Sequence, residues 1–300
     1  MGIFGKKFKS RENLPAGAMQ DQVVLITGAG GGIAGHVAEH LARAGAKLVL
    51  ADMDKDAVAA RAEALQDTTT AEYIQTVIVD VTKPEECKDA VAKAVEHFGR
   101  LDVVWGNAGI APFEFMEFMD GDKWRAVVDI NLKGVYNIVS AALPHIIKTK
   151  GYIAMTSSWA AFAHSPGHSA YSSSKAGVEA LGNALRSEVD HQGVKVGVFH
   201  PGWVDTRMVT DLQKDGSAYN LYLDSLPGPL GDVTTVQEIS RVLSVALANR
   251  SNRVVHPKPG WFLYVMRACT PLWPLKMSQV KAAPKMRQIF LRELSQKKSK

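Results

Sequence analysis

The chain has 300 residues, of which 46% are hydrophobic and 22% charged, a composition that indicates a soluble globular protein. Its net charge of +5 lies at the ends: residues 278–300 carry +6 and residues 1–20 carry +3, which leaves −4 between them. The excess of basic residues therefore gives no support to nucleic-acid binding by residues 21–277, the body of the chain. The two cysteines, Cys87 and Cys269, form neither a metal spacing nor a disulfide framework, so we expect no metal and a cytoplasmic location. The basic N-terminus is not followed by the apolar segment of a secretory signal.

The body opens with a strand, a glycine turn and a helix. Val23–Thr27 is a β-branched run that predicts a buried strand, and a helical pattern runs on to Arg43. The glycines between Gly28 and Gly32 allow the backbone to approach a pyrophosphate, and the helix N-terminus favours its negative charge. This order predicts a nucleotide-binding loop, the alternative being an ordinary flexible loop.

Asp52 ends the second predicted strand, residues 47–51. An acid roughly twenty residues past the glycines is placed to bond the adenosine ribose hydroxyls and to repel a 2′-phosphate. The glycine loop contains no Arg or Lys that would neutralise such a phosphate. Both observations predict NAD rather than NADP. The alternative is that Asp52 caps the helix that starts near Lys55.

Strands and helices continue to alternate along the rest of the body. Further strands are predicted at residues 76–79, 101–105, 151–156, 195–199 and 253–255, and helices at 84–98, 122–148, from about 168 to 190, and 235–249. Asn131, a poor residue for the middle of a helix, indicates a local bulge. The alternation predicts a Rossmann-type, doubly wound parallel sheet of about seven strands with helices on both faces. We expect one catalytic domain over residues 21–256, a basic N-terminal tail (1–20) and an aromatic and basic C-terminal extension (257–300).

Tyr171 and Lys175 are the main candidates for a catalytic pair. Four residues apart, they lie on one face of a helix that begins between Pro166 and Ala170. A free tyrosine has a pKa of about 10. A fixed ammonium beside it favours the phenolate and lowers that pKa, which suits proton exchange with an alcohol or ketone. Ser158, after the apolar run that ends at Thr156, is placed to meet the same substrate oxygen. The alternative for the pair alone is a solvated helix face.

At this point the sequence resembles the short-chain dehydrogenase/reductase family over about residues 20–255. Thr27-Gly28-x-x-x-Gly32-Ile33-Ala34 is similar to the family's cofactor turn, with Ala34 in place of its last glycine. Asn107-Ala108-Gly109 resembles its Asn-Asn-Ala-Gly element, with Gly106 in place of the first Asn. Asn131, Ser158, Tyr171 and Lys175 match its four catalytic positions in order and spacing.

The resemblance implies roles for these residues. Tyr171 would be the general acid/base, Lys175 would lower its pKa and bond the nicotinamide ribose, and Ser158 would hold the substrate oxygen. Asn131 would position a water that links Lys175 to solvent. The residues expected to bind the cofactor are Gly28, Gly30, Gly32, Ile33, Asp52, Met53, Asp80, Val81, Asn107, Ala108, Gly109, Tyr171, Lys175, Pro201, Gly202, Val204 and Thr206.

The predicted function is NAD-dependent interconversion of a secondary alcohol and a ketone. The alternatives are an NADP-linked carbonyl reductase and a catalytically silent nucleotide-binding regulator. Apolar residues after the fourth, fifth and sixth strands indicate a lipophilic substrate; they are Phe113, Phe115, Met116, Phe118, Met119, Trp159, Phe162, Trp203, Met208, Leu212, Tyr219, Leu221, Tyr222, Leu223 and Leu226. The resemblance implies a homodimer or homotetramer.

The tails suggest an additional contact. Basic residues at both ends, together with the aromatic residues between Trp261 and Trp273, suit an anionic membrane surface. The alternative is that residues 261–273 pack on a neighbouring subunit or over the active site, and that residues 287–294 form a surface helix. Vesicle co-sedimentation at low and high salt separates the two, since docking requires binding at low salt.

Overall fold

Seven strands form one parallel sheet in the order β3-β2-β1-β4-β5-β6-β7. The computed structural model describes residues 9, 12–215, 217–268 and 275–298. The strands are β1 (Val23–Thr27), β2 (Lys47–Asp52), β3 (Ile74–Ile78), β4 (Val103–Gly106), β5 (Tyr152–Thr156), β6 (Lys195–Pro201) and β7 (Arg253–His256). The chain winds outward from β1 to β3 and then returns to the other side of β1, so β1 and β4 form a topological switch point. In open α/β sheets the ligand crevice lies outside the carboxyl ends of the strands at such a point.

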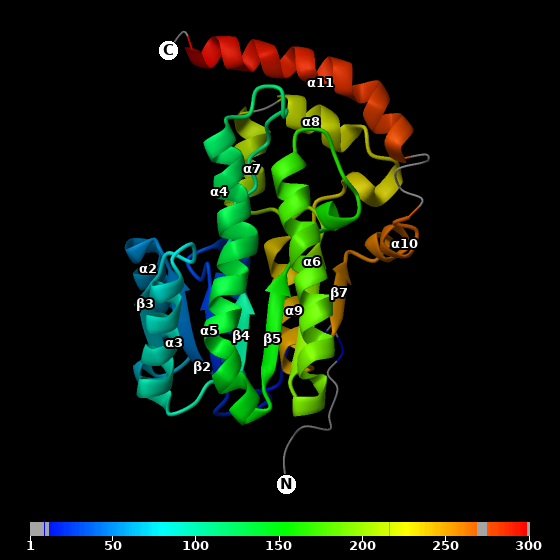
Figure 1. Cartoon of the computed structure of the whole chain (residues 1–300). Coiled ribbons are helices and arrows are strands. Elements are labelled where there is room, and N and C mark those ends of the chain that lie inside the picture. The colour runs from blue at the N-terminus through cyan, green and yellow to red at the C-terminus, as the bar shows by residue number, and fades with distance from the viewer. Residues whose placement is uncertain (1–8, 10–11, 216, 269–274, 299–300) are drawn as a thin grey trace.

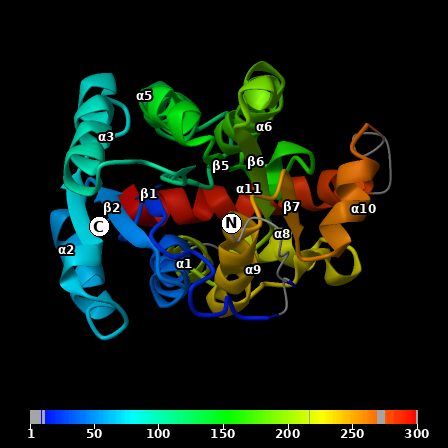
Figure 2. The ribbon, with the colours of Figure 1, turned by 90° about the horizontal axis from the view of Figure 1, so that it is seen from below.

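Helices cover both faces of the sheet, as Figure 2 shows. One face carries α1 (Gly32–Arg43), α2 (Lys55–Leu65) and α9 (Val236–Ala248), and the other carries α3 (Pro84–Phe98), α5 (Gly134–Thr149) and α6 (Ser169–Val189). Because β1 is buried on both faces, it supplies Val24 and Ile26 to one hydrophobic core and Val23 and Leu25 to the other. The predicted doubly wound sheet is confirmed.

The sequence pattern misplaced the starts of two strands. β3 begins at Ile74, two residues before the prediction, because as an edge strand it is only half-buried and its pattern is weak. β4 begins at Val103 rather than at residue 101. Asp102, just before β4, uses its carboxylate to accept a hydrogen bond from the backbone N–H of Val23 at 3.0 Å, and its own N–H donates to Val23 O at 3.0 Å, so its side chain and backbone together hold the start of β1.

The sequence pattern predicted no helix between residues 199 and 235, and this was wrong. The segment between β6 and α9 contains α7 (Arg207–Asp215), α8 (Ser217–Asp224) and the short η5 (Gly228–Gly231). Tyr219 and Tyr222 of α8 are almost completely buried. The sequence did not indicate α7 and α8 because both helices are short and pack on elements that are distant in the sequence.

The C-terminal extension packs against the body in two places. The first is α10 (Pro259–Val265), where Leu263 joins a cluster with Trp159 and Phe162. The second is α11 (Leu275–Lys298), which lies across the carboxyl ends of the strands and over α8 (Figure 1). Met286 and Phe290 of α11 pack on α8 and on the segment between β4 and α4 (Gly121–Val128). The helix α11 therefore covers the loops at the carboxyl ends of the strands.

Two further features bear on the predicted membrane contact. Among the described residues one helix, Gly121–Thr149, is long and apolar enough to span a bilayer, but several apolar residues of its α5 part, such as Ile138 and Ile146, are buried against the sheet. The chain enters β1 at the end of the sheet opposite α11, so the described parts of the two basic segments do not share one surface (Figure 1). On α10, exposed apolar side chains are Trp261, Phe262 and Val265. Membrane contact stays a prediction that depends on the C-terminal extension, and Trp273 lies outside the described residues.

Candidate active site

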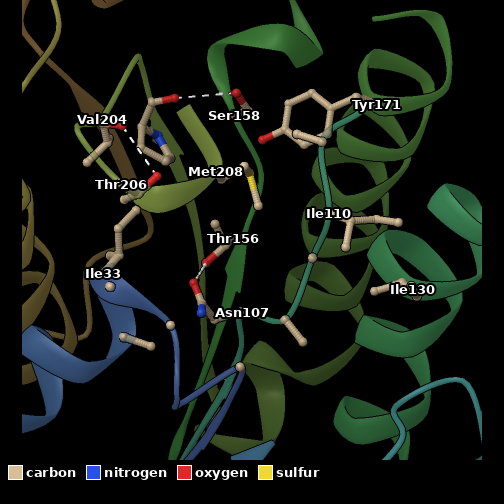
Figure 3. Close-up of a pocket in the computed structure, with 18 of the residues that line it drawn as sticks. Ile33, Asn107, Ile110, Ile130, Thr156, Ser158, Tyr171, Val204, Thr206 and Met208 are labelled. Carbon is tan, nitrogen blue, oxygen red and sulfur yellow. Dashed lines mark hydrogen bonds between the residues drawn. The ribbon is translucent and has the colours of Figure 1, made fainter. Parts of the chain in front are cut away.

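A cavity of about 530 Å³ opens at the carboxyl ends of β1, β2, β4, β5 and β6. Every site residue predicted from the sequence lines it except Gly30 and Asn131. Figure 3 shows Ile33 and Asn107 on one side of this cavity and Ser158 and Tyr171 on another. The fold therefore brings the predicted nucleotide-binding and catalytic groups into one space.

The glycine turn comes close to the segment after β4. Gly28 has a φ of +68°, and a Cβ atom there would lie 2.9 Å from the Cα of Ala108, so a side chain would force the two segments apart. Thr27 Oγ1 accepts hydrogen bonds from the backbone N–H groups of Asn107 (2.9 Å) and Ala108 (3.1 Å). The Asn107 side chain in turn accepts from Thr156 Oγ1 at 3.0 Å (Figure 3). These bonds hold the ends of β1, β4 and β5 in register around the cavity floor.

The start of α1 fits an anionic group. Its N-cap residue, Gly31, makes no side-chain capping bond, and no acidic residue lies in the first turn. The free N–H groups of the first turn therefore lie beside the cavity without a side-chain acceptor, as a pyrophosphate site requires. Gly30 does not line the cavity, but its N–H donates to Asp52 Oδ2 at 2.9 Å, and that bond fixes the acid relative to the turn.

Asp52 does not cap α2. The helix is capped by Asp54, whose Oδ1 accepts hydrogen bonds from the N–H groups of Asp56 and Ala57. Asp52 lines the cavity instead, and so do Asp80 and Val81. Burial acts to raise the pKa of Asp80, but hydrogen bonds from Thr82 and the charge of Lys83 outweigh it, so this pKa lies below its usual value. In the described part of the chain the cavity is lined by the cationic side chains of Lys175 and Arg207 alone, and both follow β5 in the chain.

Ser158, Tyr171 and Lys175 meet at the other end of the cavity. Ser158 follows β5 and caps the short η3 (Trp159–Ala161), with its Oγ accepting from Ala160 N at 3.2 Å and donating to Pro201 O at 3.4 Å. Tyr171 and Lys175 lie on one face of α6, as the four-residue spacing predicts, and Ser158 forms a hydrogen bond with Tyr171. The arrangement places two hydroxyl groups where one substrate oxygen would contact both.

The predicted effect of Lys175 on Tyr171 is not found in the ligand-free protein. Burial raises the pKa of Tyr171, and the opposing contribution comes from the hydrogen bond with Ser158 rather than from an ammonium. Burial also lowers the pKa of Lys175 to about 8. Its Nζ donates to the carbonyl oxygen of Thr156 at 2.8 Å and lies 5.6 Å from the centre of the Tyr171 ring. The desolvation of both side chains opposes the expected effect, and the role of Lys175 in lowering the pKa of Tyr171 stays a prediction.

Asn131 marks the bulge that the sequence predicted, since residues Asp129–Lys133 form a π-helical turn, η2, between α4 and α5. Its side chain is fully buried. Oδ1 accepts from Ile110 N and Nδ2 donates to Ile110 O, both at 2.8 Å, and Nδ2 also donates to Ser174 Oγ at 3.1 Å. The amide therefore fixes the segment after β4 against the catalytic helix. The water-positioning role implied by the resemblance stays a prediction.

The segment after β6 closes the cavity. Thr206 Oγ1 donates to Val204 O at 3.4 Å (Figure 3), and the N–H groups of Val209 and Thr210 donate to Thr206 O at the start of α7. Trp203, Met208 and Tyr219, which the sequence suggested as substrate-pocket residues, line this side, and so do Thr156, His168, Arg207 and Val209, which were not predicted. Of these, His168 could have been found from its position three residues before Tyr171, which places it in the same helical turn.

The family model of the short chain dehydrogenases matches residues 22–217. The chain belongs to the short-chain dehydrogenase/reductase family. It is accordingly an oxidoreductase that acts on CH–OH or carbonyl groups with a nicotinamide nucleotide.

Two named relatives each cover more than two thirds of this chain. A 3-oxoacyl-[acyl-carrier-protein] reductase of Chlamydia muridarum is 31% identical over 236 residues, which cover 78% of this chain and 93% of the relative. An 11-beta-hydroxysteroid dehydrogenase-like protein of Arabidopsis thaliana is 34% identical over 214 residues, which cover 71% of this chain and 69% of the relative.

Solved structures show the same fold. Levodione reductase superposes with a TM-score of 0.73 at 27% identity, covering 79% of this chain and 96% of that one. A 3-ketoacyl-(acyl-carrier-protein) reductase from Brucella melitensis complexed with NADH superposes with a TM-score of 0.67 at 25% identity, covering 79% and 96%.

Proposed function

We propose that the protein interconverts a lipophilic secondary alcohol and its ketone with NAD, with Tyr171 as the general acid/base. The observation that supports this most directly is the meeting of Ser158, Tyr171 and Lys175 at one end of a cavity whose other end contains Asp52. A silent nucleotide-binding regulator would have no need of this group.

The side chains suggest how the proton moves. Bound nicotinamide would accept or supply the hydride at the carbon. In the oxidising direction, the substrate hydroxyl donates its proton to the Tyr171 oxygen, and Ser158 Oγ donates a hydrogen bond to the substrate oxygen as its charge changes. Lys175 is the buried cation on the same helix face, and its positive charge favours the phenolate once Nζ faces the reacting groups.

Asp52 supports NAD over NADP. A 2′-phosphate at the ribose would lie against a carboxylate whose two oxygens are fixed by the N–H groups of Gly30 and Asp54. No lysine or arginine of the described chain lines this end of the cavity to offset the repulsion. The alternative, an NADP-linked carbonyl reductase, requires a cationic side chain beside the 2′-phosphate, and none of the described residues that line this end of the cavity supplies one.

The lipophilic substrate is supported by fewer side chains than the sequence indicated. Trp203, Met208 and Tyr219 line the cavity. Phe113, Phe115 and Phe118 instead pack against Phe290 of α11, and Phe162 packs against His200 and Tyr264. Trp159 lines a separate, smaller pocket. The remaining apolar lining still includes Ile110 and Val209.

A series of 2-alkanols with NAD and with NADP tests the proposal. Each additional buried methylene contributes roughly 0.8 kcal/mol, so kcat/KM should rise by up to about fourfold per carbon until the cavity is filled. A flat or falling series, or a preference for sugars or hydroxy acids, would contradict the lipophilic substrate. No turnover of any alcohol or ketone with either cofactor would favour the silent regulator.

We also infer a homodimer or homotetramer, as is typical of the family. Tyr136, on the outer face of α5, is 55% exposed and is one of the large apolar side chains that an interface would cover. Light scattering during size-exclusion chromatography measures the mass directly, and a monomer at micromolar concentration would contradict the inference.

A further inference from the structure

A second set of polar atoms lies in the cavity beside the catalytic hydroxyls. His168, three residues before Tyr171, is 3% exposed and lines the cavity, with its ring centre 6.0 Å from that of Tyr171. Tyr219 of α8 is 1% exposed and lines the same cavity, with its ring centre 6.1 Å from that of His168. Both residues come from segments that the catalytic pattern does not include.

The Tyr219 hydroxyl has no hydrogen-bond partner among the residues that the structure describes. A buried hydroxyl without a partner costs about 1–3 kcal/mol, so such groups are rare unless something else satisfies them. Burial raises the pKa of Tyr219, and the phenols of Tyr222 and Tyr171 raise it further. The ring centres of Tyr219 and Tyr222 are 6.4 Å apart, and Tyr219 lines the same cavity as Tyr171, so the unsatisfied hydroxyl belongs to the space that contains the predicted acid/base.

His168 has one ring nitrogen in use. Nδ1 lies 3.0 Å from Ser165 Oγ, and Ser165 also forms a hydrogen bond with Tyr222. The contact with Ser165 leaves Nε2 as the second ring nitrogen, and the ring lines the cavity. Burial lowers the pKa of His168 to about 4, so at neutral pH the imidazole is uncharged. Depending on its tautomer, Nε2 donates or accepts one hydrogen bond.

We propose that His168 and Tyr219 bind a second oxygen of the substrate, close to the reacting carbon. The substrate would then be dioxygenated, with a carbonyl or hydroxyl group on the carbon next to the reacting one or on the carbon beyond. Both protein groups are neutral and can donate or accept, so the second oxygen is an uncharged carbonyl or hydroxyl rather than a carboxylate or phosphate. This inference rests on the proposed function, because it gives the substrate class for the same site.

The experiment compares ketones that differ only in the second oxygen. Octan-2-one, octane-2,3-dione and octane-2,4-dione are reduced with saturating NADH or NADPH by wild type, Tyr219→Phe and a control, Tyr152→Phe. Tyr152 is a buried tyrosine in β5, and its hydroxyl donates to Ser251 O, away from the cavity. In Tyr219→Phe the ratio of kcat/KM for the better dione to that for octan-2-one should fall by about five- to tenfold, the effect of one lost hydrogen bond. The ratio should not change in Tyr152→Phe.

A second pair of variants separates hydrogen bonding from packing. His168→Leu should lower the dione preference in the same way, and His168→Gln, which keeps a donor and an acceptor, should restore part of it. Tyr219→Phe should leave the melting temperature unchanged or higher, since the hydroxyl has no partner among the described residues. An equal loss for octan-2-one and both diones in Tyr219→Phe would overturn the proposal.

Failure of the proposed function can be recognised separately. If the wild type reduces none of the ketones, calorimetry measures the binding of octane-2,3-diol and octan-2-ol to the protein saturated with the nucleotide that it binds. Tighter binding of the diol that is lost in Tyr219→Phe would support the second-oxygen site without turnover. Equal binding of diol and alcohol would reject it.

Discussion

Lys175 Nζ donates to the carbonyl oxygen of Thr156, at the end of β5, while it lies 5.6 Å from the centre of the Tyr171 ring. The bond ties the catalytic helix α6 to the strand that precedes Ser158. Burial favours the neutral form of both titratable groups, because it raises the pKa of Tyr171 and lowers that of Lys175 to about 8. Burial therefore opposes the charge on both groups, and the hydrogen bond with Ser158 acts in the other direction on Tyr171.

The first prediction is that Tyr171→Phe lowers kcat/KM by about 10²–10⁴-fold, the usual effect of losing a positioned acid/base. The ring stays, so the dissociation constant of NADH, measured by fluorescence titration, should change little. Tyr73→Phe, the same change on the surface near Asp21, is the control and should keep full activity. Turnover near the wild-type value in Tyr171→Phe would show that the acid/base is another group.

The second prediction concerns the cofactor. Two unit charges 4 Å apart interact by about 1 kcal/mol in water and about 4 kcal/mol near a protein surface, so removing the Asp52 charge should reduce the NAD preference by about tenfold or more. Asp52→Asn removes the charge and keeps the shape, and Asp54→Asn is the matched control, because Asp54 caps α2 and does not line the cavity. The measurement is kcat/KM with each cofactor. Equal efficiency with NAD and NADP in the wild type would contradict the role of Asp52.

The sheet could be predicted from local signals, but much of the site could not. Most strands are short apolar runs, and Gly28 and Asn131 indicate a turn and a bulge by their residue type, although their contacts come from distant segments. The pKa of Tyr171 and the environment of His168 depend on burial, which involves α8 and other segments distant in the sequence. For the same reason the aromatic residues from Phe113 to Phe118 suggested a substrate pocket, although most of them pack under α11.

The third prediction is a pH effect on stability. The pKa of His168 is lowered from 6.5 to about 4 by burial, so the folded state favours the neutral ring. Its contribution is fully present above pH 6.5 and is lost as the pH falls towards 4, because the unfolded chain binds the proton first. The residues that face the ring are Phe113, Tyr171, Trp203, Tyr219 and Tyr222, none of them charged at these pH values.

Urea unfolding at pH 7 and pH 5 measures this effect. At 1.36 kcal/mol per pH unit, the loss of unfolding free energy attributable to His168 between pH 6.5 and pH 5 is about 2 kcal/mol. His168→Gln should remove about this much of the acid sensitivity, whereas His191→Gln, at an exposed position, should leave it unchanged. Identical pH dependence in wild type and His168→Gln would indicate that the imidazole does not stay neutral.

The fourth prediction concerns the attachment of the C-terminal extension to the catalytic helix. Glu179 lies on α6, four residues after Lys175, and is 6% exposed. Its carboxylate pairs with Arg253 of β7 at 2.9 Å and with Arg267, after α10, at 2.7 Å, and both guanidinium groups lie over the Tyr264 ring. Glu179 therefore connects α6, β7 and the extension through one buried carboxylate.

Glu179→Gln should lower the free energy of unfolding by about 3 kcal/mol, the lower end for a buried pair that loses one partner, because the Arg267 side chain stays 48% exposed. Glu85→Gln is the control: its pair with Lys88 is on the surface and should contribute less than about 1 kcal/mol. Since Glu179 does not line the cavity, kcat should be retained at temperatures where the variant is folded. Trypsin should cleave the extension faster in Glu179→Gln than in wild type, because Arg267 has lost its anchor. A variant as stable and as protease-resistant as the wild type would show that apolar contacts such as that of Leu263 with Trp159 are sufficient to hold α10 in place.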